Sequence, residues 1–366
     1  MCYSTCHIAR VKCFAFCYFF YCLLNTIANY SKSYVKMDIG NKTSAIITWN
    51  LIKMTILKIE QYYIPIFMCL SLLGNSLSIC VFFRSKLRYF SSSIYLSALA
   101  VSDTGVLVTI IISESSANKV FRICIQNFFA FISVWLVVAV TVERYVAIKW
   151  PLLRRSLCTI THAKIVVIIL TGIAVFFTIP WFEFFFSIDI HTQDNNTKSE
   201  ISDTEDKNNI KSLILRIMDM IIMFALPLIM ILIFNTLIVW NIYKQNHIQK
   251  DLFIESGTFR ERIQIASNET QTKITKMLIL ISSTFICLNT PVYICWFIND
   301  YHISNKPIWL DVAWHISDLL WMMNYGINFV LYCASGHNFR RALIRMFTRR
   351  QDTGRNNNLT QIQNYE

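Results

Sequence analysis

Seven long stretches of this chain carry almost no charged side chains. Each is close to the length of about 20 apolar residues that a helix needs to cross a bilayer. Only 15% of the 366 residues are charged, fewer than a soluble protein of this length carries. The sequence therefore predicts an all-α membrane protein, a bundle of seven transmembrane helices. The expected spans are residues 61–83, 89–113, 123–142, 165–182, 220–243, 277–299 and 312–336.

The remaining charged residues are distributed unevenly between the loops, within a net charge of +12. The loop after the third span is basic, and the loop after the fourth is mainly acidic. Because cytoplasmic loops are enriched in Lys and Arg, the basic loops and the basic tail are expected inside. This orientation places the N-terminus outside, in a multi-pass protein expected in the plasma membrane. The uneven placement also argues against a nucleic-acid partner.

The same pattern divides the chain into segments. Residues 1–57 are expected to form an extracellular segment, residues 58–347 the membrane domain, and residues 348–366 a cytoplasmic tail. An apolar run at residues 13–24 is too short to span and fits either a signal peptide or a wrongly predicted start. Glycosylation sequons expected on the outer side begin at Asn29, Asn41 and Asn195.

Polar motifs within the spans carry a family resemblance: Gly74-Asn75-Ser76, Leu99-Ala-Val-Ser-Asp103, Glu143-Arg144-Tyr145 and Asn328-Phe-Val-Leu-Tyr332. Polar residues inside membrane segments are costly and are usually kept for function. Together these motifs resemble rhodopsin-like (class A) G-protein-coupled receptors over residues 62–347. Phe329 stands where the family usually has proline, which is similar to invertebrate neuropeptide receptors of the FMRFamide type. The resemblance implies a receptor rather than an enzyme, with an extracellular peptide ligand and a heterotrimeric G protein as partners.

The resemblance assigns a switch to the cytoplasmic end of the bundle. Glu143 is expected to neutralise Arg144 at rest, and the released Arg144 would face the G protein. Such a charge pair is a two-state element that a ligand can bias. The switch is completed by Tyr145, by Tyr332, and by Leu152 from the second inner loop. The alternative is a charged pair that merely ends a span at the interface.

Asp103 lies in the middle of the second span, where a lone carboxylate is a functional candidate. By resemblance it is the charged ligand of a sodium and water site. The other residues expected at this site are Asn75, Ser133, Asn324 and Asn328. The alternative is a hydrogen-bonded packing cluster that binds no ion. No cofactor beyond this sodium ion is expected.

Prolines within the fifth and sixth spans predict kinks, because each removes a backbone donor. These prolines are Pro227 and Pro291. Asn289 replaces the tryptophan that the wider family has shortly before Pro291. We hypothesise that this amide hydrogen-bonds toward Asp103 and Asn324, which would make the toggle polar rather than aromatic.

A short amphipathic surface helix is expected after Gly336. Phe339, Leu343, Met346 and Phe347 recur there at helical spacing, and arginines fill the other side. A helix of this kind lies on the lipid surface of an anionic leaflet.

The ligand pocket is expected at the outer half of the bundle, formed by Glu114, Gln126, Asp219, Tyr293, Trp296, Trp314 and Asp318. An acidic and aromatic cavity suits a basic and aromatic ligand, such as a peptide ending in Arg-Phe-amide. Two alternatives stay open: Asp219 could pair with Arg216 on its own helix, and Asp318 with His315.

The outer side departs from the family pattern. The loop between the fourth and fifth spans has no cysteine for the family's disulfide, and the stretch from Asp103 to Arg144 is shorter than usual. These departures keep open a non-signalling or decoy membrane protein, and also a class A receptor for a different small ligand. A transporter is a further alternative, weakened by the lack of an internal repeat.

Overall fold

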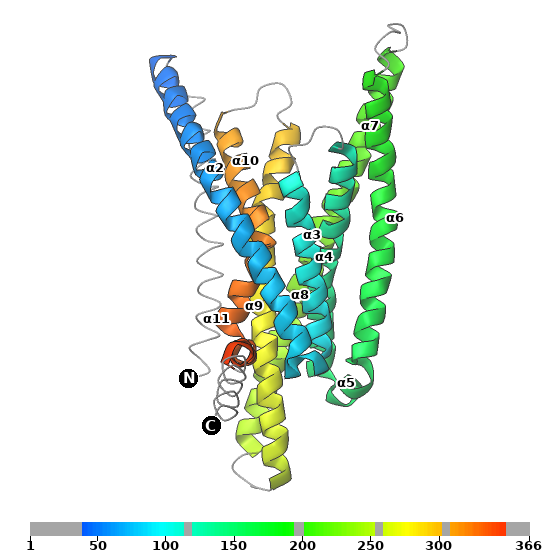
Figure 1. The fold of residues 1–366 in the computed structure, drawn as a ribbon, viewed down its shortest axis with the longest axis vertical. Coiled ribbons are helices and arrows are strands. Elements are labelled where there is room, and N and C mark those ends of the chain that lie inside the picture. The colour runs from blue at the N-terminus through cyan, green and yellow to red at the C-terminus, as the bar shows by residue number, and fades with distance from the viewer. Residues whose placement is uncertain (1–38, 113–118, 194–200, 253–258, 302–307, 349–366) are drawn as a thin grey trace, which may run out of the picture.

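The computed structural model describes residues 39–112, 119–193, 201–252, 259–301 and 308–348. Long helices run side by side along one axis, and a short helix, α5 (Pro151–Leu157), lies at the lower end (Figure 1). The long helices are α2 (Ile39–Arg84), α3 (Ser91–Ile111), α4 (Lys119–Lys149), α6 (Ile160–Gln193), α7 (Ile201–Asp219), α8 (Leu226–Leu252), α9 (Phe259–Tyr301) and α10 (Ile308–Asn324). A 3₁₀ turn, η1 (Lys86–Tyr89), connects α2 to α3.

Six helices of the described chain are long and apolar enough to cross a membrane. They correspond to the first six expected spans, although α3 covers only Ser91–Ile111 of the expected 89–113. α2 begins at Ile39, well before the expected start at residue 61. The expected boundary between an N-terminal segment and the membrane domain, at residue 57, therefore falls inside a helix. The fifth span is continuous: α7 passes through a π-helical turn, η4 (Met220–Ala225), into α8.

The seventh expected span is broken, which is why neither of its halves has the length of a transmembrane helix. α10 ends at Asn324, α11 (Asn328–Ser335) follows, and a tight turn joins them. A Cβ on Gly326 would lie 2.0 Å from Ser71 Oγ and 2.6 Å from Phe67 Cζ of α2. Only a glycine allows the turn to approach α2 this closely, because a side chain would overlap these atoms.

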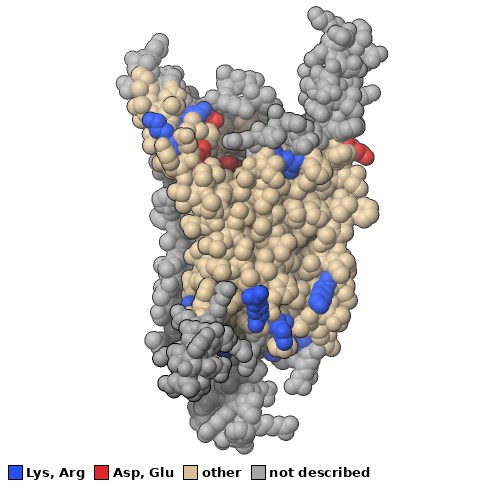
Figure 2. All heavy atoms as spheres, viewed as in Figure 1, with Lys and Arg blue, Asp and Glu red and all other residues tan. Residues whose placement is uncertain are grey.

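The helices leave a broad band of the surface without charge (Figure 2). Below this band lie basic side chains, while the upper rim carries both signs (Figure 2). Arg84, Lys149 and Lys164, near the inner ends of their helices, are exposed. α6 faces outward with a nearly continuous apolar surface. Only 6% of its most apolar 18-residue stretch is buried inside the bundle. This is the surface expected for helices solvated by lipid rather than water.

The core is centred on α3 and α4, where Leu96, Val106, Leu107 and Leu136 are fully buried. Some polar side chains inside this core form hydrogen bonds within their own helix. Thr141, for example, donates to Val137 O at 2.7 Å. Others, such as Ser133 and Asn328, bond to a side chain of another helix.

We expect Gly105→Ala to destabilise the bundle. A Cβ at this position would lie 2.4–2.6 Å from ring atoms of Phe129 on α4, so the α3–α4 contact must open. Overpacking of this kind costs about 1–3 kcal/mol. Thermal unfolding of the purified protein should show a lower midpoint, which the double variant Gly105→Ala/Phe129→Leu restores. Gly172→Ala is the matched control, since nothing lies within 4 Å of its Cβ position; an equal loss in that variant would contradict the explanation.

Candidate functional site

The buried centre of the bundle is the carboxylate of Asp103, which has no exposed surface. Ser133 of α4 donates to Asp103 Oδ1 at 2.6 Å, and Asn328 of α11 donates to Oδ2 at 2.7 Å. One side chain of α3 thus connects α4 with the lower half of the broken seventh span. Charge-assisted bonds of this kind are stronger than neutral ones, and they orient the carboxylate.

Asn75 joins the same region from α2. It is fully buried, and its Nδ2 donates to the backbone oxygen of Tyr325 at 3.1 Å. Its Oδ1 has no hydrogen-bond partner among the described residues, and neither has the hydroxyl of the fully buried Tyr332. Buried polar atoms are rarely left unpaired, so these two oxygens are positions in the network where a further ligand or donor can be accepted. Asn324 is buried at the end of α10, beside the break.

These oxygen donors fit a small hard cation better than a transition metal. The set contains one carboxylate with hydroxyl and amide oxygens, and such cations prefer oxygen ligands. No cluster of three or more His, Cys, Asp or Glu residues that could bind a metal occurs within the described ranges. Asp103 is accordingly the single charged group that could hold an ion in this centre.

Asn289 is buried on α9 near Pro291, but its amide makes a local bond. Its Nδ2 donates to Phe285 O on the same helix at 2.8 Å, rather than toward Asp103 or Asn324 as hypothesised. The carbonyl of Phe285 lies one turn before Asn289 on the same helix, so the short amide side chain can bond to it without contacting another helix. Pro291 lies inside α9, and Pro227 is buried directly after η4, where Leu226 N bonds to Ile221 O.

At the cytoplasmic end, Glu143 and Arg144 form a buried ion pair. Ser91 of α3 donates to Glu143 Oε1 at 2.6 Å, so the pair also ties α4 to the start of α3. Tyr145 packs its ring against Trp150 and Phe234 instead of joining the pair. The side chain of Leu152 lies outside the described residues. Burial, followed by the nearby Glu143 carboxylate, raises the pKa of the Cys158 thiol, which keeps it protonated near neutral pH.

Tyr332 is surrounded by aromatic rings at the inner end of α11. Its ring lies 5.4 Å from that of Phe82 on α2 and 5.3 Å from that of Phe339. Phe329 packs on Phe339 at 6.0 Å, and a Cβ on Gly74 would come within 2.9 Å of Phe329 Cβ. The residue that replaces the usual proline therefore fills space left by a glycine of α2.

Residues 337–348 are helical and begin immediately after this aromatic cluster. Phe339 is buried, Leu343 and Met346 pack against the core, and Arg340, Arg341 and Arg345 are exposed. Arg340 Nη1 donates to the backbone oxygens of Cys333 at 2.7 Å and Ala334 at 2.8 Å, which caps the C-terminus of α11.

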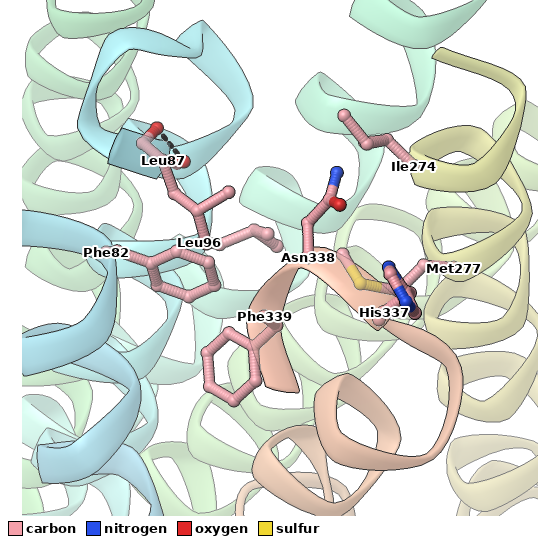
Figure 3. A pocket seen from close by; sticks show the side chains of 10 residues that line it. Phe82, Leu87, Leu96, Ile274, Met277, His337, Asn338 and Phe339 are labelled. Carbon is pink, nitrogen blue, oxygen red and sulfur yellow. Dashed lines mark hydrogen bonds between the residues drawn. The ribbon is translucent and has the colours of Figure 1, made fainter. Parts of the chain in front are cut away.

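A cavity of about 40 Å³ lies between this helix, α3 and the inner half of α9. It is lined mainly by apolar side chains: Leu87 and Leu96 lie on one side with Phe82, whose ring is beside that of Phe339, and Met277 lies on the other side (Figure 3). Its volume is enough for roughly three waters by the usual size of one probe sphere. Packing therefore leaves a gap where α9 meets the segment after Gly336.

The expected pocket residues fall into two groups at the outer half. Asp219 lies at the junction of α7 and η4, and within η4 the ring of Phe224 stacks on that of Tyr293 of α9 at 4.4 Å. Asp318 lies on α10 and is exposed. Gln126, Trp296 and Trp314 are half-buried. Glu114, Asn29 and Asn195 lie outside the described residues, as does the side chain of Asn41.

Two polar contacts between α2 and α10 were not predicted from the sequence. His315 Nδ1 lies 3.3 Å from Glu60 Oε1, and Lys53 pairs with Asp311. His315 thus faces an acid on another helix, whereas pairing with Asp318 was the alternative considered. Charges near the ends of spans give no pairing signal in the sequence, because their partners depend on how α2 and α10 are rotated.

The cysteines of the described residues are free, including Cys124, which is buried on α4. Within these ranges the structure contains no disulfide, in line with the loop cysteine missing from the sequence. The connection between α3 and α4 at residues 113–118 lies outside the described residues.

A helical bundle with a buried acid at its centre and a buried ion pair at its inner end defines a class of membrane receptor. The family model of the seven-transmembrane receptors (rhodopsin family) matches residues 74–332, and the chain belongs to this family. It is a multi-pass membrane protein and a G-protein-coupled receptor, not an enzyme.

Relatives in this family include several receptors. The chain is 23% identical to a putative G-protein coupled receptor of Caenorhabditis elegans, over 77% of the chain and 71% of that protein. It is 24% identical to the FMRFamide receptor of Drosophila melanogaster, over 77% of the chain but only 52% of that protein. It is 32% identical to neuromedin-U receptor 1 of Rattus norvegicus, over 30% of the chain and 28% of that protein.

Proposed function

We propose that this protein is a plasma-membrane receptor for an amidated neuropeptide of the FMRFamide type, with its N-terminus outside. The observation that carries the proposal is the outer half of the bundle, where Asp219 directly precedes η4, whose Phe224 stacks on Tyr293, and where Glu60 lies 3.3 Å from His315. A guanidinium pairs with such carboxylates, and an aromatic ring packs on such tyrosines. Similarity to peptide receptors, the fly FMRFamide receptor among them, supports the same ligand class.

The inner end is proposed to transmit binding to a heterotrimeric G protein. In the described state the Glu143–Arg144 pair is closed and buried, which represents the resting arrangement. A ligand that favours an open arrangement of the bundle would release Arg144 toward the G protein. It can do so only by binding the open state more tightly than the closed one.

Three further elements complete the proposal. Asp103 is proposed to bind an allosteric sodium ion together with the surrounding oxygen donors. The helix at residues 337–348 is proposed to lie on the inner leaflet, with Arg341 and Arg345 at the lipid headgroups. Asn29, Asn41 and Asn195 are proposed glycosylation sites on the outer side.

The ligand class can be tested with a panel of peptides on cells that express the receptor at the surface. We expect G-protein activation by peptides ending in Arg-Phe-amide, and a loss of roughly tenfold or more in potency for the free-acid and Ala-Phe-amide forms, because each removes an ionic or polar contact. Asp219→Asn should weaken the response to the Arg-containing peptide more than the response to the Ala-containing one. A response to another peptide or small ligand would reject the FMRFamide assignment. No response with full surface expression would favour a non-signalling protein.

A further inference from the structure

The outer part of α2 is attached to the start of α10 by two polar contacts that the proposed mechanism does not use. Lys53 pairs with Asp311, and His315 Nδ1 lies 3.3 Å from Glu60 Oε1. The first contact is the more exposed one: the side chain of Lys53 is 33% exposed and that of Asp311 is 43% exposed. Glu60 and His315 are better shielded, with 15% and 25% of their side chains exposed. The Lys53–Asp311 pair therefore forms the rim of the contact between the two helices.

This rim lies beyond the lipid. α2 is continuous from Ile39 to Arg84, and Lys53 precedes the fully buried Asn75 by about six turns, or roughly 33 Å at the usual helical rise. The hydrocarbon core extends only about 15 Å to either side of its centre. The Lys53–Asp311 pair is therefore in contact with water. A partly exposed ion pair contributes little net free energy, so replacing one cation by another costs little at this position.

Asp311 shares a face of α10 with one of the expected pocket residues. Asp311, His315 and Asp318 follow one another at helical spacing, which places them on one side of the helix. Asp318 is exposed, and Asp311 lies about 10 Å further out along the helix axis. An extended tetrapeptide is up to about 14 Å long. A peptide whose inner end lies at the level of Asp318 is therefore long enough to place its other end beside Asp311.

We propose that Asp311 binds the N-terminal ammonium of the peptide ligand, and that Lys53 occupies this position until the ligand arrives. The two groups are chemically alike, because each is a primary ammonium that a carboxylate accepts in the same geometry. Lys53 is thus a competitor within the receptor, and its flexible four-carbon stem allows the displaced ammonium to turn into water. The inference rests on the proposed ligand class, and it adds recognition of the peptide end opposite the amide.

The test is equilibrium binding of the tetrapeptide Phe-Met-Arg-Phe-amide and of its N-acetyl form to purified receptor. We expect Asp311→Asn to weaken binding of the free peptide by roughly fivefold, a modest factor because the contact is screened by solvent. Lys53→Met should strengthen it by roughly threefold, because an exposed competing pair of modest strength is removed. Neither variant should change binding of the acetylated peptide, which has no terminal ammonium. Lys58→Met, exposed on the same helix, is the matched control and should change neither affinity.

The opposite signs of the two effects distinguish recognition from a structural role. If the pair only fastened α2 to α10, both variants would weaken binding, and the acetylated peptide would be affected equally. That result would overturn the inference, as would an equal gain in Lys58→Met or no binding to either the wild type or Lys53→Met. Binding with the expected pattern but without nucleotide exchange would contradict the proposed signalling function alone. Activation by the peptide with unchanged affinities in both variants would contradict only the role of Asp311.

Discussion

Replacing Arg144 with alanine is expected to reduce G-protein activation by about 10- to 100-fold, since charge-assisted bonds contribute about 1.5–3 kcal/mol. Arg144 is almost fully buried and pairs with Glu143, which also accepts from Ser91. In the proposed mechanism the released guanidinium is the group that contacts the G protein. The measurement is peptide-stimulated nucleotide exchange, normalised to the amount of receptor at the surface.

Loss of Arg144 also leaves a buried carboxylate unpaired, which destabilises by about 3–5 kcal/mol. The double variant Glu143→Gln/Arg144→Ala separates the two effects. The neutral glutamine can still accept from Ser91, so folding should recover while signalling should not. Glu143→Gln alone should raise basal exchange several-fold, because Arg144 then loses its counter-charge. Full signalling by the double variant would show that Arg144 has only a structural role.

Replacing Asp103 with alanine is expected to have the second largest effect, on stability and on signalling together. The variant strands the Ser133 hydroxyl and the Asn328 amide in the core, and each unsatisfied buried group costs about 1–3 kcal/mol. The unfolding midpoint should fall sharply, and peptide binding should no longer be coupled to exchange. Thermal unfolding and exchange assays on the same preparation measure both effects.

Asp103→Asn separates the charge from the packing. It keeps the shape and most hydrogen bonds, so it should fold nearly as well as the wild type. Sodium should raise the unfolding temperature of the wild type relative to a large organic cation, and this difference should vanish in Asp103→Asn. An equal response in both would reject the sodium site and leave a packing cluster. Ser76→Ala is a suitable control, since Ser76 is exposed and bonds only to Leu72 O of its own helix.

Most of the helix assignment followed from the sequence, because lipid permits few charges between the ends of a span. Asp103 was identifiable for the same reason: a buried charge in an apolar run is rare without a purpose. The broken seventh span was less predictable, since Gly326 marks a turn only when Ser71 and Phe67 stand against it. The length of α2 was also missed, because Lys53 and Glu60 interrupt its apolar pattern without ending the helix.

The hydrogen-bond partners of the buried polar residues could not be predicted from the sequence. Asn289 was expected to reach another helix and instead bonds to Phe285 O, while Asn75 reaches Tyr325 O across the bundle. Both are buried amides in apolar spans, and the sequence does not distinguish them. Their difference arises from the rotation of each helix and from the turn that frees an acceptor near Asn75.

The sequence by itself determined the family, the spans, their expected orientation and the positions where polar groups enter the membrane, because transfer of charge into lipid is costly wherever it occurs. Only the tertiary structure decided which of those groups meet. It joined Asp103 to Ser133 and Asn328, Glu143 to Ser91, and Glu60 to His315. The pattern of hydrophobic residues along a chain shows which segments can lie in lipid and where polar residues interrupt them. Which polar side chains then bond to each other depends on the distances between helices and on their rotations.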